Sequence, residues 1–179
     1  MSGRFRLTRR RAVLLLLTVG FVLAASSSSR LVFGRESDDR TIARGGGTTI
    51  IAGGTGASGG FVPVLTTVAF HAERSSQGAT GTLDCLALAP EAGTGSRSGQ
   101  FTTNAMYVVG HITRATVNGD TATLIGEASI TGLGAGENVP FKFVVQKGGP
   151  GATSVLTVDS LSSPFNEVLL QGSYEVFPS

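Results

Sequence analysis

Two histidines, His71 and His111, are the first candidates for acid–base chemistry or metal binding in this chain. They lie on different predicted strands, and neither has a cysteine or carboxylate at the spacing that a metal site requires. Glu73 follows His71 by two residues, which places both on the same face of a strand. We therefore expect a local ion pair, worth less than about 1 kcal/mol when exposed, rather than a metal site.

Other chemically capable side chains also lack a supporting pattern. No motif positions a base beside a serine, so a Ser-His-Asp arrangement is not predicted. Asp84 and Glu127 could flank a glycosidic bond, as any two carboxylates could, and their spacing does not favour it. Cys85 is the only cysteine, so no intramolecular disulfide can form, and because it shares a face with Leu83 we expect a buried thiol. We assign no catalytic, cofactor-binding or metal-binding residue from the sequence.

A glycine-rich run from Thr49 to Gly60 resembles the first strand and glycine loop of short-chain dehydrogenases. That site requires a helix directly after the loop, so that the helix N-terminus meets the pyrophosphate. Here the following residues alternate, are rich in β-branched side chains and include Pro63. The expected Tyr-x-x-x-Lys pair is also absent, because His111 stands four residues after Tyr107. The run is therefore predicted to be a flexible strand or loop, with no nucleotide, nicotinamide or haem cofactor.

The elements that would position these side chains are β-strands, because apolar and polar residues alternate through most of the chain after Gly45. A long strand from Phe101 to Val117 is expected to bend or bulge near Gly110. Another short strand is expected over Val155–Asp159. The residues predicted to share a face are Val68, Phe70 and Ala72; Leu83, Cys85 and Ala87; Met106, Val108 and Ile112; Ala122, Leu124, Gly126, Ala128 and Ile130; Val139, Phe141, Phe143 and Val145; and Val168, Leu170, Tyr174 and Val176.

Short turns separate these strands. Asn118 and Gly119 predict a two-residue type I′ hairpin turn, which needs positive φ at both central residues. Glycine-rich loops over 132–136 and 148–151 predict two further turns. About eight strands joined in this way predict an all-β domain, a single antiparallel meander. Closing it into a barrel, fully or nearly, would remove both sheet edges, and a two-sheet sandwich is the alternative.

The order of strands and turns also carries a resemblance. Gly110–Thr113, Val117–Gly126, Phe141–Val145 and Gly148–Gly151 resemble parts of a glycine-rich β-domain that recurs in exported bacterial proteins, most of them uncharacterised. The similarity would cover roughly residues 45–177. The residues that carry the resemblance belong to turns and core strands. The resemblance therefore implies the fold, and no functional residue can be assigned from it.

The first residues predict where the protein acts. Met1–Arg11 carries five arginines and no acid, and the apolar run that follows, Ala12–Ala25, is shorter than the roughly 20 residues that span a membrane. We predict an export signal over residues 1–25, a flexible polar leader over 26–44 and a β-rich domain over 45–179 with no transmembrane segment. Thr8–Leu14 partly matches a twin-arginine signal, but the general secretory route is favoured.

The net charge and the predicted export together limit the function. Five of the 14 basic residues precede residue 12, which leaves nine against 12 acidic residues and argues against nucleic-acid binding. We therefore expect a secreted or envelope protein. Because no polar side chains converge, a non-catalytic structural or interaction module that contacts an extracellular or envelope macromolecule is favoured. The alternative is a small barrel that binds an apolar molecule at its open end, with weak enzymatic use of Tyr107 or His111.

Overall fold

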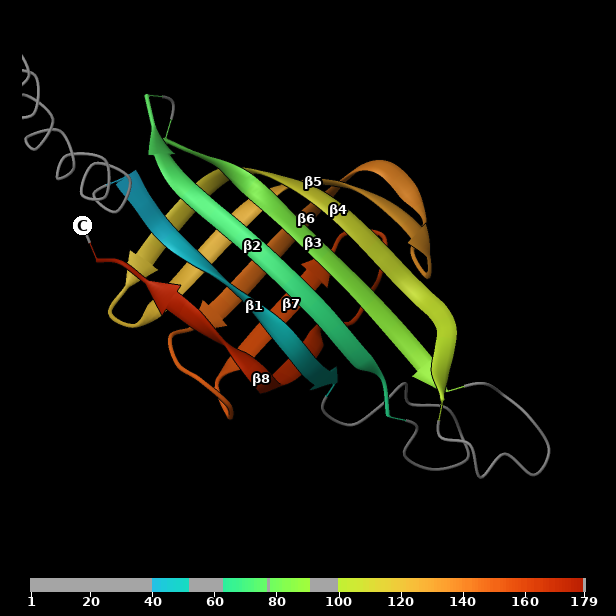
Figure 1. Cartoon of the computed structure of the whole chain (residues 1–179). Coiled ribbons are helices and arrows are strands. Elements are labelled where there is room, and N and C mark those ends of the chain that lie inside the picture. Colours follow the sequence, from blue (N-terminus) through green and yellow to red (C-terminus); the bar gives the residue numbers. More distant parts are fainter. Residues whose placement is uncertain (1–39, 52–62, 77, 91–99, 179) are drawn as a thin grey trace, which may run out of the picture. The chain divides into compact units, whose positions relative to one another are not determined.

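Eight antiparallel strands form a closed ring in the computed structural model, which describes residues 40–51, 63–76, 78–90 and 100–178 (Figure 1). Each strand pairs with the next one in the chain, and the last strand pairs with the first. This confirms the all-β meander, and its closure selects the barrel over the sandwich. The strands are β1 (Thr41–Ile51), β2 (Leu65–Ser75), β3 (Gly78–Pro90), β4 (Phe101–Asn118), β5 (Thr121–Gly132), β6 (Gly136–Gln146), β7 (Thr153–Val158) and β8 (Phe165–Val176).

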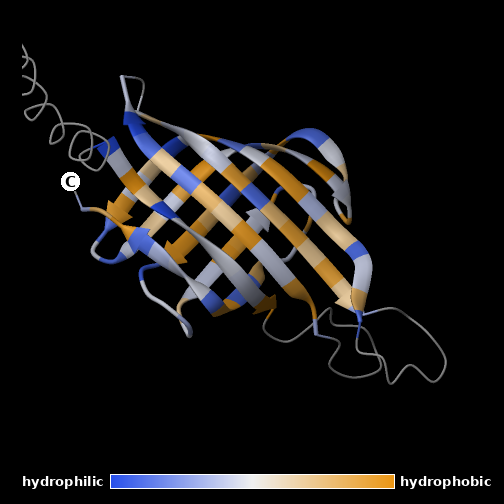
Figure 2. Ribbon diagram, in the orientation of Figure 1, coloured by the Kyte–Doolittle hydropathy of each residue, from blue (hydrophilic) through white to orange (hydrophobic). Residues whose placement is uncertain are grey.

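Hydrophobic and hydrophilic residues alternate along the strands, so that each strand turns one apolar face into the barrel (Figure 2). On β2, for example, Val68 and Phe70 are buried, while Thr67 before them and Ala69 between them are exposed to solvent. The shared faces predicted for β2 to β6 are confirmed, with Val139 only half-buried. The buried residues on these faces are Val68, Phe70, Ala72, Leu83, Cys85, Ala87, Met106, Val108, Ile112, Ala122, Leu124, Ala128, Ile130, Phe141, Phe143 and Val145.

Aromatic rings from opposite walls meet in the middle of the barrel. The ring of Phe70 lies 5.5 Å from that of Phe143 in an edge-to-face contact, and 5.5 Å from that of Tyr174 in a tilted one. In Figure 1 the strands β5 to β7 cross behind β1 to β3, which allows side chains from β2, β6 and β8 to touch. These contacts bury large apolar areas and fix the walls relative to one another.

The predicted bend in the longest strand is a change of pairing register. The register between β4 and β5 shifts between Ile112 and Arg114, close to Gly110 as expected. Gly110 itself lies beneath an aromatic ring, because a Cβ there would stand 2.7 Å from Cε1 of Phe141. The glycine therefore allows the Phe141 ring to pack against β4.

The hairpin between β4 and β5 exists, but its predicted type is wrong. Asn118 pairs with Thr121, so the two loop residues are Gly119 and Asp120. Gly119 has a φ of 57°, and neither Asn118 nor Asp120 has a positive φ. A positive φ at the first loop residue alone fits a type II′ turn, for which glycine is the preferred first residue.

The predicted face of β8 is wrong in its first half. Val168 is only half-buried and Leu170 is 48% exposed, whereas Glu167 and Leu169 are buried together with Tyr174 and Val176. The cause is a bulge: Thr48 of β1 pairs with Gln171 but Thr49 pairs with Leu169, so Leu170 has no partner of its own. An extra residue reverses which side chains point inward, and it brings Glu167 into the barrel.

The barrel begins earlier in the chain than the sequence suggested. β1 starts at Thr41, and Thr41, Ile42 and Ala43 are buried, so the end of the predicted leader belongs to the first strand. Residues 1–39, with the predicted export signal and most of the leader, lie outside the described residues, as do residues 52–60 of the glycine-rich run. Within the described part of the chain, no helix combines the length and the apolar character needed to cross a membrane.

Candidate functional site

The two histidines lie on the outer surface and do not meet. His71 on β2 and His111 on β4 are both opposite Thr82 of β3, so a whole strand separates them. With neighbouring strands about 4.8 Å apart, their backbones are about 10 Å from each other. His71 instead contacts Glu73 at 3.5 Å between Nε2 and Oε1, which confirms the expected local pair.

Tyr107 and His111 also belong to the outer surface. They alternate with the buried Val108, Gly110 and Ile112 of β4, and Tyr107 is 37% exposed. The Tyr107 hydroxyl lies 3.5 Å from Asp84 Oδ1 at the surface. A molecule inside the barrel would therefore not touch Tyr107 or His111, which is contrary to the enzymatic use that the sequence suggested for them.

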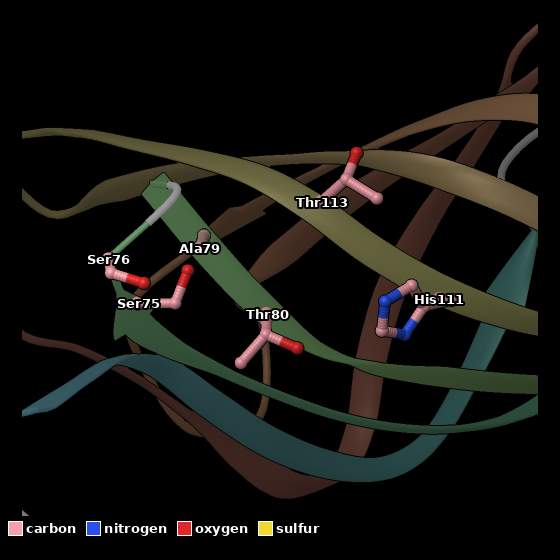
Figure 3. A pocket seen from close by; sticks show the side chains of 6 residues that line it. All are labelled: Ser75, Ser76, Ala79, Thr80, His111 and Thr113. Atoms are coloured by element: carbon pink, nitrogen blue, oxygen red, sulfur yellow. The ribbon is translucent and has the colours of Figure 1, made fainter.

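An open depression on this outer surface is lined by His111 (Figure 3). It lies over β3 and β4, and its other lining side chains are small, among them Thr80 and Thr113. Neither of these can transfer a proton at neutral pH. Asp84 and Glu127 are on β3 and β5 with β4 between them, and among the described residues no group of three or more metal-ligating side chains occurs. His111 and Glu127, which are paired directly across β4 and β5, line a second open depression on this surface together with Glu137.

The barrel interior contains a carboxyl group. Glu167 on β8 is only 3% exposed and stands opposite Ile51 of β1 and Ser154 of β7. Its Oε2 accepts a 2.6 Å hydrogen bond from the hydroxyl of Thr49 on β1. Among the described residues no arginine, lysine or histidine is buried with it. A buried carboxyl with no cationic partner is costly to ionise, and one hydrogen bond offsets only part of that cost.

Burial therefore raises the pKa of Glu167 from 4.5 to about 7, and the hydrogen bond from Thr49 partly opposes the shift. A carboxyl with this pKa is present in both protonated and ionised forms at neutral pH. It can accept a hydrogen bond when ionised and donate one when protonated.

Thr66 provides a second unusual group beside Glu167. Thr66 on β2 is fully buried and pairs directly with Thr49, so their side chains are neighbours on the inner face. Its Oγ1 has no hydrogen-bond partner among the described residues, whereas its backbone carbonyl lies 3.4 Å from Thr49 Oγ1. Such an unpaired hydroxyl costs about 1–3 kcal/mol in a folded protein, so its presence asks for an explanation.

Two weaker acids complete the interior. Burial raises the pKa of Cys85 well above 9.0, and the charge of Glu167 raises it further. Burial also raises the pKa of Tyr174 to about 12; a contact with Ser154, 3.4 Å between hydroxyl oxygens, opposes the shift, and Glu167 and Cys85 add to it. Cys85 and Tyr174 are thus neutral at pH 7. We call Thr49, Thr66, Cys85, Ser154, Glu167 and Tyr174 the interior polar cluster.

Part of the interior polar cluster lies near one end of the barrel. Thr49 is close to the last residue of β1, Thr66 is the second residue of β2, and Glu167 is the third residue of β8. In an antiparallel meander these positions fall at the same end, where β1 ends and where β2 and β8 begin. We call this the polar end of the barrel. It lies beyond the contacts of Phe70 with Phe143 and Tyr174 that fill the middle.

The sequence did not predict this site, apart from the burial of Cys85, which is confirmed. Thr49 was noted only as the start of the glycine-rich run and Thr66 was not singled out, and the predicted face with Val168 and Leu170 placed Glu167 outside. The one available signal was Gly172, which has a φ of 116° and follows the bulge at Leu170. Glycine inside a strand often marks such a bulge, and a bulge re-aims the side chains beside it.

Fold and interior together define the class of this protein: an antiparallel eight-stranded barrel with a buried carboxyl group inside. Comparisons with protein-family models, with curated proteins and with solved structures found no match to this chain. The resemblance to exported β-domains consequently stays a prediction, and the function has to be argued from the site itself.

Proposed function

We propose that this protein is an exported, non-catalytic binding protein that holds a small, mostly apolar molecule at the polar end of its barrel. The observation that carries the proposal is the buried carboxyl of Glu167, which has one hydrogen-bond donor, Thr49, and no buried cation among the described residues. A barrel that needed only stability would gain from an apolar residue at this position. A ligand that hydrogen-bonds to the carboxyl would give the residue a purpose.

The surroundings of Glu167 support an apolar ligand. Ile51 and Leu169, which are buried beside Glu167 and Thr49, offer aliphatic surface at the polar end. Small-molecule sites generally combine such surface with a few convergent polar groups. Eight strands enclose a space that side chains can fill or that can hold one small ligand. We place the ligand at the polar end, beyond the aromatic contacts in the middle.

The experiment is native mass spectrometry of the protein recovered from the medium or envelope of its own host. We expect a small molecule that stays bound in the native spectrum and is released on denaturation. Glu167→Leu should lose it while remaining folded, because leucine removes a buried ionisable group. The matched control, Glu127→Leu, changes an exposed carboxylate on β5 and should keep the molecule. A native protein free of any small molecule, in both host fractions, would refute the proposal.

A second candidate function, the interaction module favoured by the sequence, is supported by a patch on the outer surface. Tyr107 and Val109 of β4 are 37% and 46% exposed, and Leu86 of β3 lies opposite Tyr107. Adjacent exposed apolar side chains of this kind occur at protein interfaces. Recovery of a partner protein at fixed stoichiometry, lost in Tyr107→Ser and kept in Glu167→Leu, would support this function instead.

A further inference from the structure

One member of the interior polar cluster, Thr66, has a hydroxyl with no hydrogen-bond partner among the described residues. Its neighbours indicate which kind of chemical group could pair with it. Thr49 lies between Glu167 and Thr66: it donates its hydroxyl hydrogen to Glu167 at 2.6 Å and is paired in register with Thr66. A hydroxyl has a single hydrogen, so Thr49 has none left for other acceptors. The Thr66 hydroxyl therefore receives no hydrogen bond from Thr49, its nearest polar neighbour.

Glu167 and Thr66 need opposite hydrogen-bonding partners from a ligand: a donor for Glu167 and an acceptor for Thr66. The ionised carboxyl of Glu167 only accepts hydrogen bonds, and the one it accepts from Thr49 is made at Oε2. Thr66 Oγ1 is buried and unpaired, and its hydrogen needs an acceptor. A group that reaches both must donate to one and accept from the other.

We propose that the ligand of this barrel is a neutral, mostly apolar molecule whose hydroxyl group hydrogen-bonds to both Glu167 and Thr66. The inference rests on the proposed function and names its ligand class. A hydroxyl oxygen can donate to Glu167 and accept from Thr66 at the same time. An ammonium group only donates, and a carboxylate only accepts and would repel ionised Glu167. An alkane would leave both protein groups unpaired.

The side chains around the three polar residues require the rest of the ligand to be apolar. Ala87 of β3 is opposite Thr66, Leu169 of β8 is opposite Thr49, and both are buried. The neighbouring strands thus place aliphatic groups beside the hydroxyl site. Further polar groups on the ligand would lose their hydration here and gain no partner.

The test uses compounds that share a chain and differ in the head group: 1-hexanol, hexylamine, hexanoic acid and hexane, with the corresponding ten-carbon set. Binding to the full chain as its host produces it, after removal of any co-purifying molecule, is measured by titration calorimetry and ligand-observed NMR at pH 8. We expect each alcohol to bind at least about tenfold more tightly than the alkane, amine and acid of equal length, because two hydrogen bonds distinguish it.

Variants of Thr66 test the assignment of the second partner. Thr66→Val should reduce the preference for alcohol over alkane to within about threefold, and Thr66→Ser, which keeps a hydroxyl, should retain it. Thr67→Val is the matched control, since Thr67 is the next residue and is exposed on the outer face. A thermal melt checks that each variant is folded; valine replaces an unpaired buried hydroxyl, so we expect no loss of stability.

The possible failures can be told apart. If compounds bind without preference for the alcohol, or if Thr66→Val leaves that preference unchanged, the hydroxyl inference is wrong while interior binding stands; a tightly held water between Glu167 and Thr66 would give this result. Tighter binding of the amine or the acid would likewise overturn it. If no compound binds and no small molecule co-purifies from the host, the proposed function fails along with the inference.

Discussion

Thr49 Oγ1 and Glu167 Oε2 are 2.6 Å apart, and the strands that carry them are the first and the last of the barrel. The two residues are separated by 118 positions in the chain. They meet because β1 pairs with β8, the pairing that closes the ring. The hydrogen bond of the candidate site therefore depends on barrel closure, and the properties of Glu167 report on the intact fold.

Stability should depend on pH through Glu167. Burial raises its pKa from 4.5 to about 7, so between these values the folded protein holds a proton that the unfolded chain has released. The free energy of unfolding should thus fall as the pH rises from about 4.5 to 7, by about 3 kcal/mol in total, and change little above. Burial also raises the pKa values of Cys85 and Tyr174, the other titratable groups of the cluster, which stay neutral in this range.

Urea unfolding curves between pH 4 and 8 measure this dependence. In Glu167→Gln the downward slope between pH 4.5 and 7 should disappear, since the amide does not titrate. Glu127→Gln, at an exposed position of β5, should leave the slope as it is in the natural protein. A stability that rises with pH over this interval would show that Glu167 is ionised and stabilised in the fold.

Closure of the barrel should be sensitive to Gly172. This residue has a φ of 116°, and a Cβ there would overlap the backbone carbonyl of Gly46 on β1. Gly172→Ala should destabilise the protein by about 2 kcal/mol or more, because both the backbone conformation and the contact are unfavourable for alanine. Gly149→Ala is the control: a Cβ there has no atom within 4 Å, and we expect a change within about 1 kcal/mol. Equal effects in chemical denaturation would contradict the role assigned to Gly172.

The aromatic contacts in the middle of the barrel should dominate its stability. Phe143 is 1% exposed and meets Phe70 edge to face, so Phe143→Ala should cost about 3–5 kcal/mol. The adjacent Lys142 points to solvent, and Lys142→Ala should change the stability by less than about 0.5 kcal/mol. Denaturant midpoints of the two variants check this, and a near-neutral Phe143→Ala would disprove the inward orientation of β6.

The thiol of Cys85 should be protected in the folded protein. It is 2% exposed, and burial raises its pKa well above 9.0, so both access and the thiolate fraction are low. Labelling with a bulky aromatic disulfide reagent at pH 8 should be at least about a hundredfold slower in buffer than in denaturant, since it requires local opening. Modification at similar rates under both conditions would mean that the β3 face is open to reagents.

Alternation in the sequence was sufficient for most of the fold. Val68 with Phe70, or Phe141 with Phe143, are spaced by two because a strand buries one face, and this period survives in any arrangement of the sheet. The hairpin after Asn118 was likewise visible, although its register was displaced by one residue. Local sequence favours a turn but does not determine which two residues occupy the loop, since that depends on how β4 and β5 pair.

The chain by itself thus determined that strands follow one another with a buried face, and that Cys85 lies on such a face. Only the tertiary structure decided that Glu167 points inward. Val168, Leu170, Tyr174 and Val176 would share one face of a regular strand, yet pairing with β1 inserts Leu170 as a bulge and reverses the inward side before it. A pattern within one strand cannot report a register set by a partner more than a hundred residues away, and the candidate site depends on that register.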